Sequence, residues 1–143
     1  MNRYKFRAKR EDNGKWVYGS LSNFDEQSGY VYILEPFIQA STLPVFTLMK
    51  ENLHLVDKRT VGQYTGLKDK NGVEIYEGDI VKGFSRNAVV KIGFPHNEKN
   101  HSYGVYAEWT KYKLQEVQYI NNYVFENLEV IGNIYENKEL LEN

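Results

Sequence analysis

Apolar and basic residues alternate over residues 3–9 of the chain. The apolar positions are Tyr4, Phe6 and Ala8, and the basic positions are Arg3, Lys5, Arg7 and Lys9. A period of two predicts a β-strand with one solvated face. The Asn13-Gly14 pair that follows suits a tight hairpin turn. Since the chain then returns as KWVYG over residues 15–19, we predict a β-hairpin here.

Short runs of β-branched and aromatic residues continue along the chain, with turn-forming residues between them. They predict strands over residues 29–34, 60–67, 73–76, 79–84, 89–94, 103–109 and 128–135. Residues 43–56 are ambiguous, because helical spacing indicates a short helix over 46–52 while LPVF and LHLV also suit short strands. Residues 113–120 suit either a short helix or a strand. Residues 138–143 predict a final short helix that Asn137 could cap.

The stretch QYTGLKDKNGVEIYEGDIVKG, residues 63–83, concentrates glycines and charged residues in a short span. It reads as two strands joined by one turn, then a second turn that leads into a third strand. The turn residues are Asp69, Asn71 and Gly72 in the first turn and Gly78 and Asp79 in the second. These residue types favour turns and left-handed backbone conformations. We therefore interpret the stretch as a signature of the fold.

The pattern as a whole predicts a mainly β protein, a β-rich α+β fold. Short antiparallel strands would form a partly open β-barrel, with one to three short helices. The 143 residues suit a single domain, residues 1–143. The alternative is an N-terminal β-hairpin part over residues 1–58 and a barrel-like part over residues 59–143.

Composition excludes several classes of function. The 18 basic and 19 acidic residues nearly cancel, so the strong basic excess of a dominant nucleic-acid surface is absent. The sequence has no cysteine, which excludes disulfides, thiolate zinc sites and thiol nucleophiles. The charged start MNRYKFRAKRED does not suit a secretory signal, and no apolar run is long enough to span a bilayer. We expect a cytoplasmic protein.

The sequence does not match the known motifs of metal-binding and phosphate-binding loops. An EF-hand loop starting at Asp69 would close on Ile80 instead of a glutamate. The Gly-Lys-Ser/Thr triplet of a phosphate-binding loop does not occur. His96 and His101 flank a polar loop and His54 lies far away in sequence, so we predict no metal site.

Three carboxylates, Glu74, Glu77 and Asp79, lie close together in the sequence. Paired carboxylates can divide acid and base work, but only in a cleft that shifts their pKa values. A solvated turn is the simpler interpretation. We therefore predict no enzymatic activity, no catalytic residues and no cofactor.

Two sets of residues are candidates for binding. The basic residues Arg3, Lys5 and Arg7 could contact nucleic acid, although lysines and arginines also protect an edge strand from pairing, and we favour the edge-strand interpretation. The chain is rich in tyrosine, with 12 Tyr among 143 residues, which suits half-exposed sheet faces and protein interfaces. The tyrosines chosen as candidate contacts are Tyr64, Tyr76 and Tyr106.

The sequence resembles the YopX family of phage and prophage proteins. The resemblance rests on YKFRAK near the start, TVGQYTGLKDKNGVEIYEGDIV in the middle, VVKIGF, and LEVIGNIYENKELL at the end. Two positions depart from the family pattern: Lys9 stands where tryptophan is frequent, and Lys138 where proline is frequent. These stretches lie between residues 4 and 141 and so frame nearly the full length of the chain.

The resemblance implies a compact, mostly β fold with a barrel-like part, in a protein carried by temperate phages. It brings no catalytic mechanism and no functional residues. With the tyrosine-rich composition, it leads us to expect a non-enzymatic accessory protein in the cytoplasm of the bacterial host. We expect it to bind a phage or host protein and to self-associate. The alternative is a small β-barrel that binds nucleic acid.

Overall fold

In the computed structural model of the chain, β-strands are the predominant secondary structure. The described residues are 5–23, 26–37, 42–83, 87–93, 103–111, 114–119 and 127–142, with the backbone alone for 109–111 and 114–119. They form two compact units, residues 2–63 and residues 64–143. The boundary falls inside β5, so this strand contributes to both units. The division of the chain into two parts, residues 1–58 and 59–143, stays a prediction.

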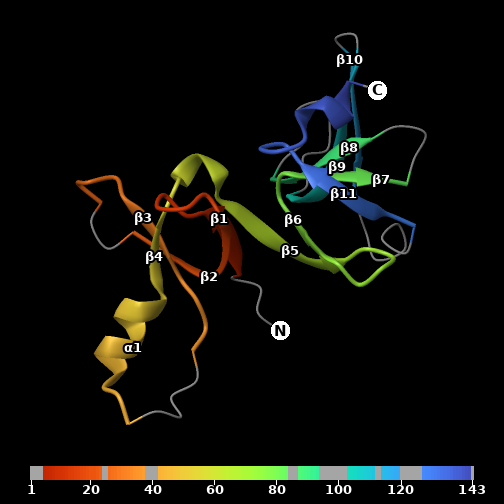
Figure 1. The fold of residues 1–143 in the computed structure, drawn as a ribbon. Helices are drawn as coiled ribbons and strands as arrows, with labels where there is room; N and C mark the ends of the chain where they lie inside the picture. The colour runs from red at the N-terminus through yellow and green to blue at the C-terminus, as the bar shows by residue number, and fades with distance from the viewer. Residues whose placement is uncertain are drawn as a thin grey trace. The chain divides into compact units, whose positions relative to one another are not determined.

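The first unit is an antiparallel sheet with one helix (Figure 1). Its elements are β1 Phe6–Lys9, β2 Trp16–Ser22, β3 Val31–Leu34, α1 Val45–Asn52, β4 Leu53–Val56, the 3-10 helix η1 Lys58–Thr60 and the start of β5 Gly62–Lys68. The strand order is β4-β3-β2-β1-β5. The predicted hairpin is confirmed, with Phe6 opposite Gly19 and Lys9 opposite Trp16.

The end of β1 also hydrogen-bonds to the far strand of this sheet. Arg10 bridges to Val56, the Glu11 N–H donates to the Leu55 carbonyl at 3.0 Å, and the Asp57 N–H donates to the Lys9 carbonyl at 2.8 Å. The sheet therefore curls around a small apolar core. The buried core residues are Ala8, Val17, Ile33 and Val56.

Residues 43–56 contain both of the structures that the sequence left open. α1 follows Pro44 and buries Leu48, and the Asn52 side chain donates to the Leu48 carbonyl at 2.7 Å near the helix end. The chain then enters β4 at Leu53 without a loop. The backbone at Leu53 is extended, with φ −95° and ψ 121°, so the helix ends where β4 pairs with β3.

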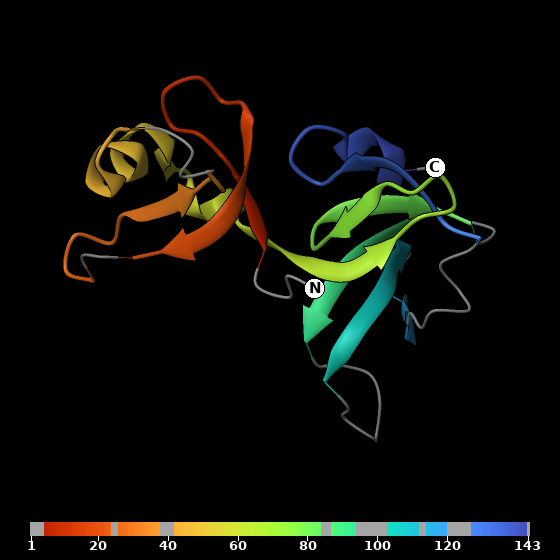
Figure 2. The ribbon, with the colours of Figure 1, turned by 90° about the horizontal axis from the view of Figure 1, so that it is seen from below.

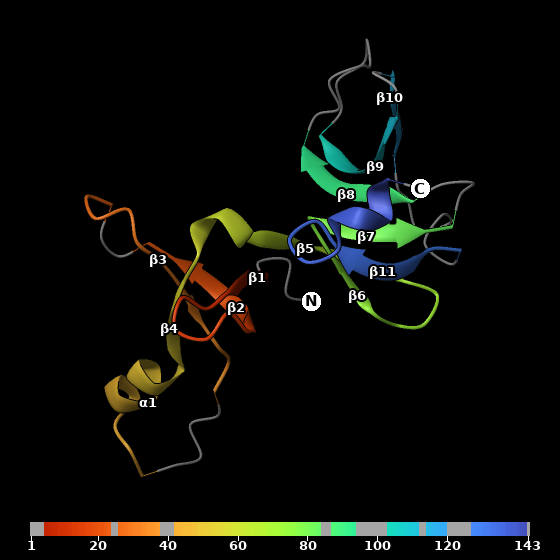
Figure 3. The ribbon, with the colours of Figure 1, turned by 45° about the horizontal axis from the view of Figure 1, so that its top comes forward.

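The second unit is a five-stranded antiparallel sheet with a short hairpin. The hairpin comprises β5 and β6 Glu74–Tyr76, and the sheet comprises β7 Asp79–Lys82, β8 Ala88–Gly93, β9 Gly104–Lys111, β10 Leu114–Tyr119 and β11 Glu129–Asn133. The strand order is β10-β9-β8-β7-β11, and β7 lies beside β11 (Figure 3). Residues 113–120 thus take the strand alternative. The strands β7, β8 and β9 appear in green to cyan in Figure 2.

The core of the second unit is aliphatic. Its buried members are Ile75, Val81, Ala88, Val90, Ala107 and Leu128. The predicted final helix is a 3-10 helix, η2 Lys138–Leu141, and Asn137 does not cap it with its side chain. The Asn137 side chain instead accepts the Asn133 N–H at 3.2 Å, because Asn133 and Asn137 close a tight turn after β11.

The predicted mainly β, β-rich α+β fold is confirmed. Both sheets are antiparallel throughout, as the turn-rich sequence suggested. Among the strands that the structure describes, no sheet closes into a complete barrel.

Candidate functional site

The basic face predicted on the first strand is not a solvated row. Arg3 lies outside the described residues, and Lys5 is half-buried. Arg7 is only 7% exposed, and its guanidinium carbon lies 4.6 Å from the centroid of the Trp16 ring. The interpretation of β1 as an edge strand is wrong, because β2 pairs with one side of it and Gly62 of β5 pairs with the other.

The tyrosines chosen from the sequence are mostly buried. Tyr76 is 2% exposed and Tyr106 is 5% exposed, so neither can serve as a surface contact. Tyr64 is half-buried opposite Tyr76, with ring centroids 5.4 Å apart. The Tyr76 hydroxyl donates to the Glu74 carboxylate at 2.9 Å. These aromatic rings help to pack the β5–β6 hairpin.

Asp69 organises the first turn of the central stretch. The residue is 6% exposed, and its carboxylate accepts the N–H groups of Asn71 at 2.8 Å, Val73 at 2.9 Å and Val130 at 2.9 Å. The first two bonds close the turn, and the third ties it to β11. Gly72 has a φ of +80° in the same turn. The side chain therefore stabilises the fold of this turn.

The second turn connects β6 to β7 through Gly78 and Asp79. Asp79 is 1% exposed and accepts the Tyr76 N–H at 2.8 Å. Gly78 has a φ of +89°, donates to the Val90 carbonyl and accepts the Ile134 N–H, both at 2.9 Å. Glycine suits this position because other residues rarely adopt a positive φ.

The three neighbouring carboxylates do not share one role. Glu74 accepts the Tyr76 hydroxyl, Asp79 accepts the Tyr76 N–H, and Glu77 accepts the Ile92 N–H at 3.4 Å. Asp79 is buried, so the prediction that all three lie in a solvated turn is wrong for this residue. Each carboxylate contacts a group of the fold itself.

Lowering the pH is expected to remove the stabilisation that Asp69 provides. Burial of Asp69 opposes ionisation, but the N–H groups of Val130, Val73 and Asn71 outweigh it and hold the carboxyl pKa below 3.8. The contribution is therefore present above pH 3.8 and is lost as the pH falls through the lower pKa of the folded state. Denaturant unfolding at a series of acidic pH values, compared with Asp69→Asn, measures it. If the free energy of unfolding fell equally with pH in the wild type and in Asp69→Asn, this expectation would be contradicted.

The described residues include no group of three or more His, Asp or Glu side chains arranged to hold a metal ion. His54 is paired with Glu35 at 2.7 Å, between Nε2 and Oε2. His96 and His101 lie outside the described residues. In the described part of the chain, no helix is long and apolar enough to cross a membrane.

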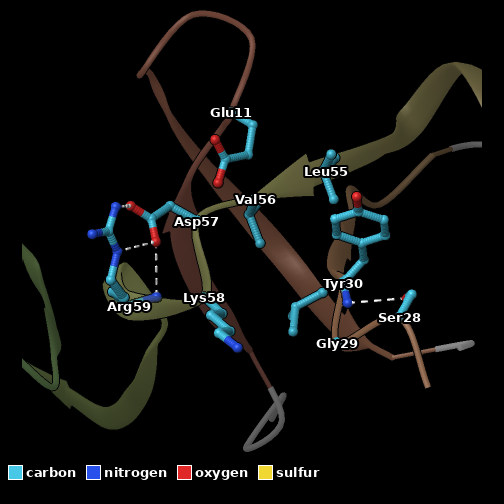
Figure 4. A pocket seen from close by; sticks show the side chains of 10 residues that line it. Glu11, Ser28, Gly29, Tyr30, Leu55, Val56, Asp57, Lys58 and Arg59 are labelled. Atoms are coloured by element: carbon cyan, nitrogen blue, oxygen red, sulfur yellow. Dashed lines mark hydrogen bonds and ion pairs between the residues drawn. The ribbon is translucent and has the colours of Figure 1, made fainter. Parts of the chain in front are cut away.

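A pocket of about 460 Å³ opens on the first unit, where the end of β1 meets β3, β4 and η1 (Figure 4). Its lining includes the apolar side chains of Tyr30, Val31, Leu55 and Val56. Val56 is buried, whereas Leu55 is 37% exposed and Tyr30 is 57% exposed. Tyr30 and Leu55 therefore leave apolar surface in contact with water beside this pocket.

Charged side chains surround this apolar lining. Asp57 and Arg59 form an ion pair of 2.8 Å, and Asp57 also accepts the Arg59 backbone N–H at 3.0 Å. The hydrogen bonds from Arg59 hold the pKa of the Asp57 carboxyl below its ordinary value. In Figure 4, Glu11 and Lys58 lie at opposite ends of the pocket, with Val56 between them.

A second hollow of about 330 Å³ adjoins the first and shares Glu11 and Leu55 with it. A backbone hydrogen bond joins these two residues, from the Glu11 N–H to the Leu55 carbonyl at 3.0 Å. The second hollow is lined further by Arg10, Asp12, Leu53 and His54. Arg10 is paired with Asp12 there, so much of its charge is balanced within the chain.

The sequence did not reveal the pocket, because its lining comes from three separate segments. These are Glu11, residues 28–31 and residues 55–59. The pairing of β3 with β4 and the contact of β4 with the end of β1 bring them together. Tyr30 and Leu55 alone gave a weak signal, as apolar residues beside turn-forming or charged neighbours.

Comparison with known proteins gives a family match. The model of the family described as "YopX protein" matches residues 5–142. Among solved structures, the crystal structure of protein EF1440 from Enterococcus faecalis is similar, with 23% sequence identity, coverage of 96% of both chains and a TM-score of 0.40. No curated protein matches the sequence.

Proposed function

The chain belongs to the YopX family, and from this premise we propose that it is a non-enzymatic accessory protein that binds another protein. We place it in phages or prophages and in the cytoplasm of the bacterial host. Its partner in this proposal is a phage or host protein that presents an apolar side chain to the pocket beside β4.

The observation that carries the proposal is the exposed apolar surface beside the pocket. Tyr30 and Leu55 keep 57% and 37% of their surface exposed, whereas Val56 in the same lining is buried. Protein interfaces concentrate binding energy in a few aromatic or aliphatic anchors that fill pockets, with a polar rim around them. The charged residues around this pocket, including Asp57 and Arg59, suit such a rim.

The residue chemistry of the central stretch supports a binding role over catalysis. Asp69 and Asp79 are buried and hydrogen-bond to backbone N–H groups. Because these carboxylates already stabilise turns, the stretch that looked most like a ligand loop is accounted for by folding. The pocket of the first unit is then the better candidate for a partner.

Replacing both Tyr30 and Leu55 by serine is expected to abolish capture of the partner. Tagged protein would be recovered from phage-carrying cells, with and without nuclease, and co-purifying proteins identified. Loss of a hot-spot anchor weakens binding by about 2 kcal/mol or more, or roughly thirtyfold. The matched control is Tyr103→Ser, which changes a tyrosine that is 66% exposed in the second unit.

The proposal would be supported if Tyr103→Ser still captured a protein partner and the double variant did not, with the same result in the presence and absence of nuclease. A protein partner that both variants retain would move the interface away from this pocket. Partners that disappear with nuclease would contradict the proposal and support nucleic-acid binding instead. Circular dichroism of both variants checks that each one is folded.

A further inference from the structure

The charges in the lining of the pocket beside β4 cancel in sum but are separated in space. Its acidic residues are Glu11 and Asp57, and its basic residues are Lys58 and Arg59. The lining as a whole therefore favours neither anions nor cations. Which of these charges a neighbour already neutralises, and where the others lie, decides the chemistry of the partner that the pocket suits.

Asp57 and Arg59 neutralise each other within the chain. The Asp57 carboxylate accepts hydrogen bonds from the Arg59 guanidinium at 2.9 and 2.8 Å and from the Arg59 backbone N–H at 3.0 Å. A bidentate pair of this kind fixes the geometry of both side chains. The hydrogen bond to Asp57 is also the largest cause of the raised pKa of Arg59, and Glu11 contributes less to it. The charges that remain for a partner are those of Glu11 and Lys58.

Glu11 and Lys58 lie at opposite ends of the pocket. The Glu11 N–H donates to the Leu55 carbonyl at 3.0 Å, which holds Glu11 beside this residue. The Lys58 Nζ lies 4.0 Å from the position that a Cβ on Gly29 would take. Figure 4 shows Val56 between the two ends. Glu11 and Lys58 are both exposed, and in the described part of the chain no side chain hydrogen-bonds to either charged group.

Apolar surface lies between these two charges. It comprises the buried Val56 and the exposed side chains of Tyr30 and Leu55. The pocket thus presents a carboxylate, an apolar surface and an ammonium in that order, and its volume of about 460 Å³ is sufficient for a ligand of several groups. A complementary ligand has a cation, an apolar group and an anion in the same order. Opposite charges at the two ends favour one orientation of docking.

We propose that the pocket beside β4 binds a linear segment of its protein partner in which an aromatic or aliphatic side chain lies between a basic and an acidic side chain. This inference rests on the proposed function, because it specifies the partner of the same pocket. The basic side chain pairs with Glu11, the apolar one packs beside Val56, and the acidic one pairs with Lys58. Since both charge pairs are exposed, the apolar contact supplies most of the affinity, and the charges select and orient the segment.

Selection from a display library of random linear peptides tests which segment the pocket prefers. The chain of residues 1–143 is immobilised, and peptides that also bind the Tyr30→Ser, Leu55→Ser double variant are removed. The remaining peptides are expected to share an aromatic or aliphatic residue with a lysine or arginine on one side and an aspartate or glutamate on the other. Enrichment of apolar residues alone, of charges of one sign, or of no common sequence would overturn the proposal.

Double-mutant cycles with one selected peptide test each charge pair. Fluorescence anisotropy of the labelled peptide gives its dissociation constant. Glu11→Gln and Lys58→Gln are each expected to weaken binding about threefold. Replacing the basic residue of the peptide by glutamine should cause no further loss in Glu11→Gln but the full loss in Lys58→Gln, and replacing the acidic residue should give the opposite pattern. Equal losses in the two variants would overturn the assigned pairing.

The matched controls are Glu129→Gln and Lys70→Gln, which neutralise a carboxylate and an ammonium in the second unit. These side chains are 39% and 45% exposed, and their replacement should leave the dissociation constant unchanged. Higher ionic strength should reduce the effects of Glu11→Gln and Lys58→Gln, because salt screens exposed charges. Losses that do not depend on salt would contradict the charge pairing.

Failure of this inference can be separated from failure of the proposed function. If the Tyr30→Ser, Leu55→Ser double variant lost a captured protein while the selection gave no peptide with both charges, the pocket would remain a partner site and this inference alone would fail. If the double variant retained every captured protein, the proposed function would fail. If neither experiment gave its expected result, both proposals would fail.

Discussion

Replacing Asp69 by alanine is expected to destabilise the unit of residues 64–143 by about 3–5 kcal/mol. Asp69 is 6% exposed, and its carboxylate accepts three backbone N–H groups, from Asn71, Val73 and Val130. Alanine would leave these donors without their acceptor, and each buried N–H without a partner costs about 1–3 kcal/mol. The loss would be a large share of the stability of a typical domain, about 5–15 kcal/mol.

Denaturant unfolding of Asp69→Ala, with amide exchange to locate the change, measures this effect. Protection should fall most at Asn71, Val73 and Val130, because their N–H groups lose the carboxylate. The matched control is Asp12→Ala, since Asp12 has a side chain that is 63% exposed in its pair with Arg10. Such a surface pair contributes about 1 kcal/mol or less. Equal effects of the two alanine variants would contradict the role assigned to Asp69.

Replacing Gly19 by alanine is expected to destabilise the unit of residues 2–63 by about 3 kcal/mol or more. A Cβ at Gly19 would lie 2.0 Å from the Leu34 carbonyl oxygen and 2.8 Å from the Leu34 carbonyl carbon. Both atoms belong to the backbone of β3, which pairs with β2 at Leu34. They cannot move aside as a side-chain end could, so β2 and β3 would have to separate.

The adjacent change Ser20→Ala is the control for Gly19→Ala. Ser20 is exposed and pairs with Leu34 in the same register, and its replacement should alter stability by about 0.5 kcal/mol or less. Denaturant unfolding gives the free energies, and amide exchange should show lost protection in β2 and β3. A Gly19→Ala variant as stable as Ser20→Ala would show that the two strands can accommodate a methyl group.

Local patterns in the sequence were sufficient to predict many of the elements. Alternation and Asn13-Gly14 predicted the first hairpin, and the turn residues around Gly72 and Gly78 marked the two turns between β5 and β7. These predictions depend on backbone preferences of a few neighbouring residues, which operate in any context. The same local reasoning left residues 43–56 open, because apolar residues at helical spacing overlapped with strand-forming dipeptides.

Burial of the candidate binding residues required knowledge of contacts between distant segments. Alternation assigned Arg7 to the side opposite Phe6, but could not show that Arg7 is buried beside the Trp16 ring. Tyrosine is likewise common at protein interfaces, yet Tyr76 and Tyr106 are both buried. A period of two separates the faces of a strand without saying which of them another element covers.

The β-rich class, the positions of most turns and the family of the chain could all be read from the amino-acid sequence. Those properties reside in short stretches of adjacent residues. The hydrogen bond between Asp69 and Val130, and the pocket that Glu11, Tyr30 and Leu55 line together, became visible in the folded chain. The physical reason is that strand pairing joins residues far apart in the chain, and no local preference specifies which strands become neighbours.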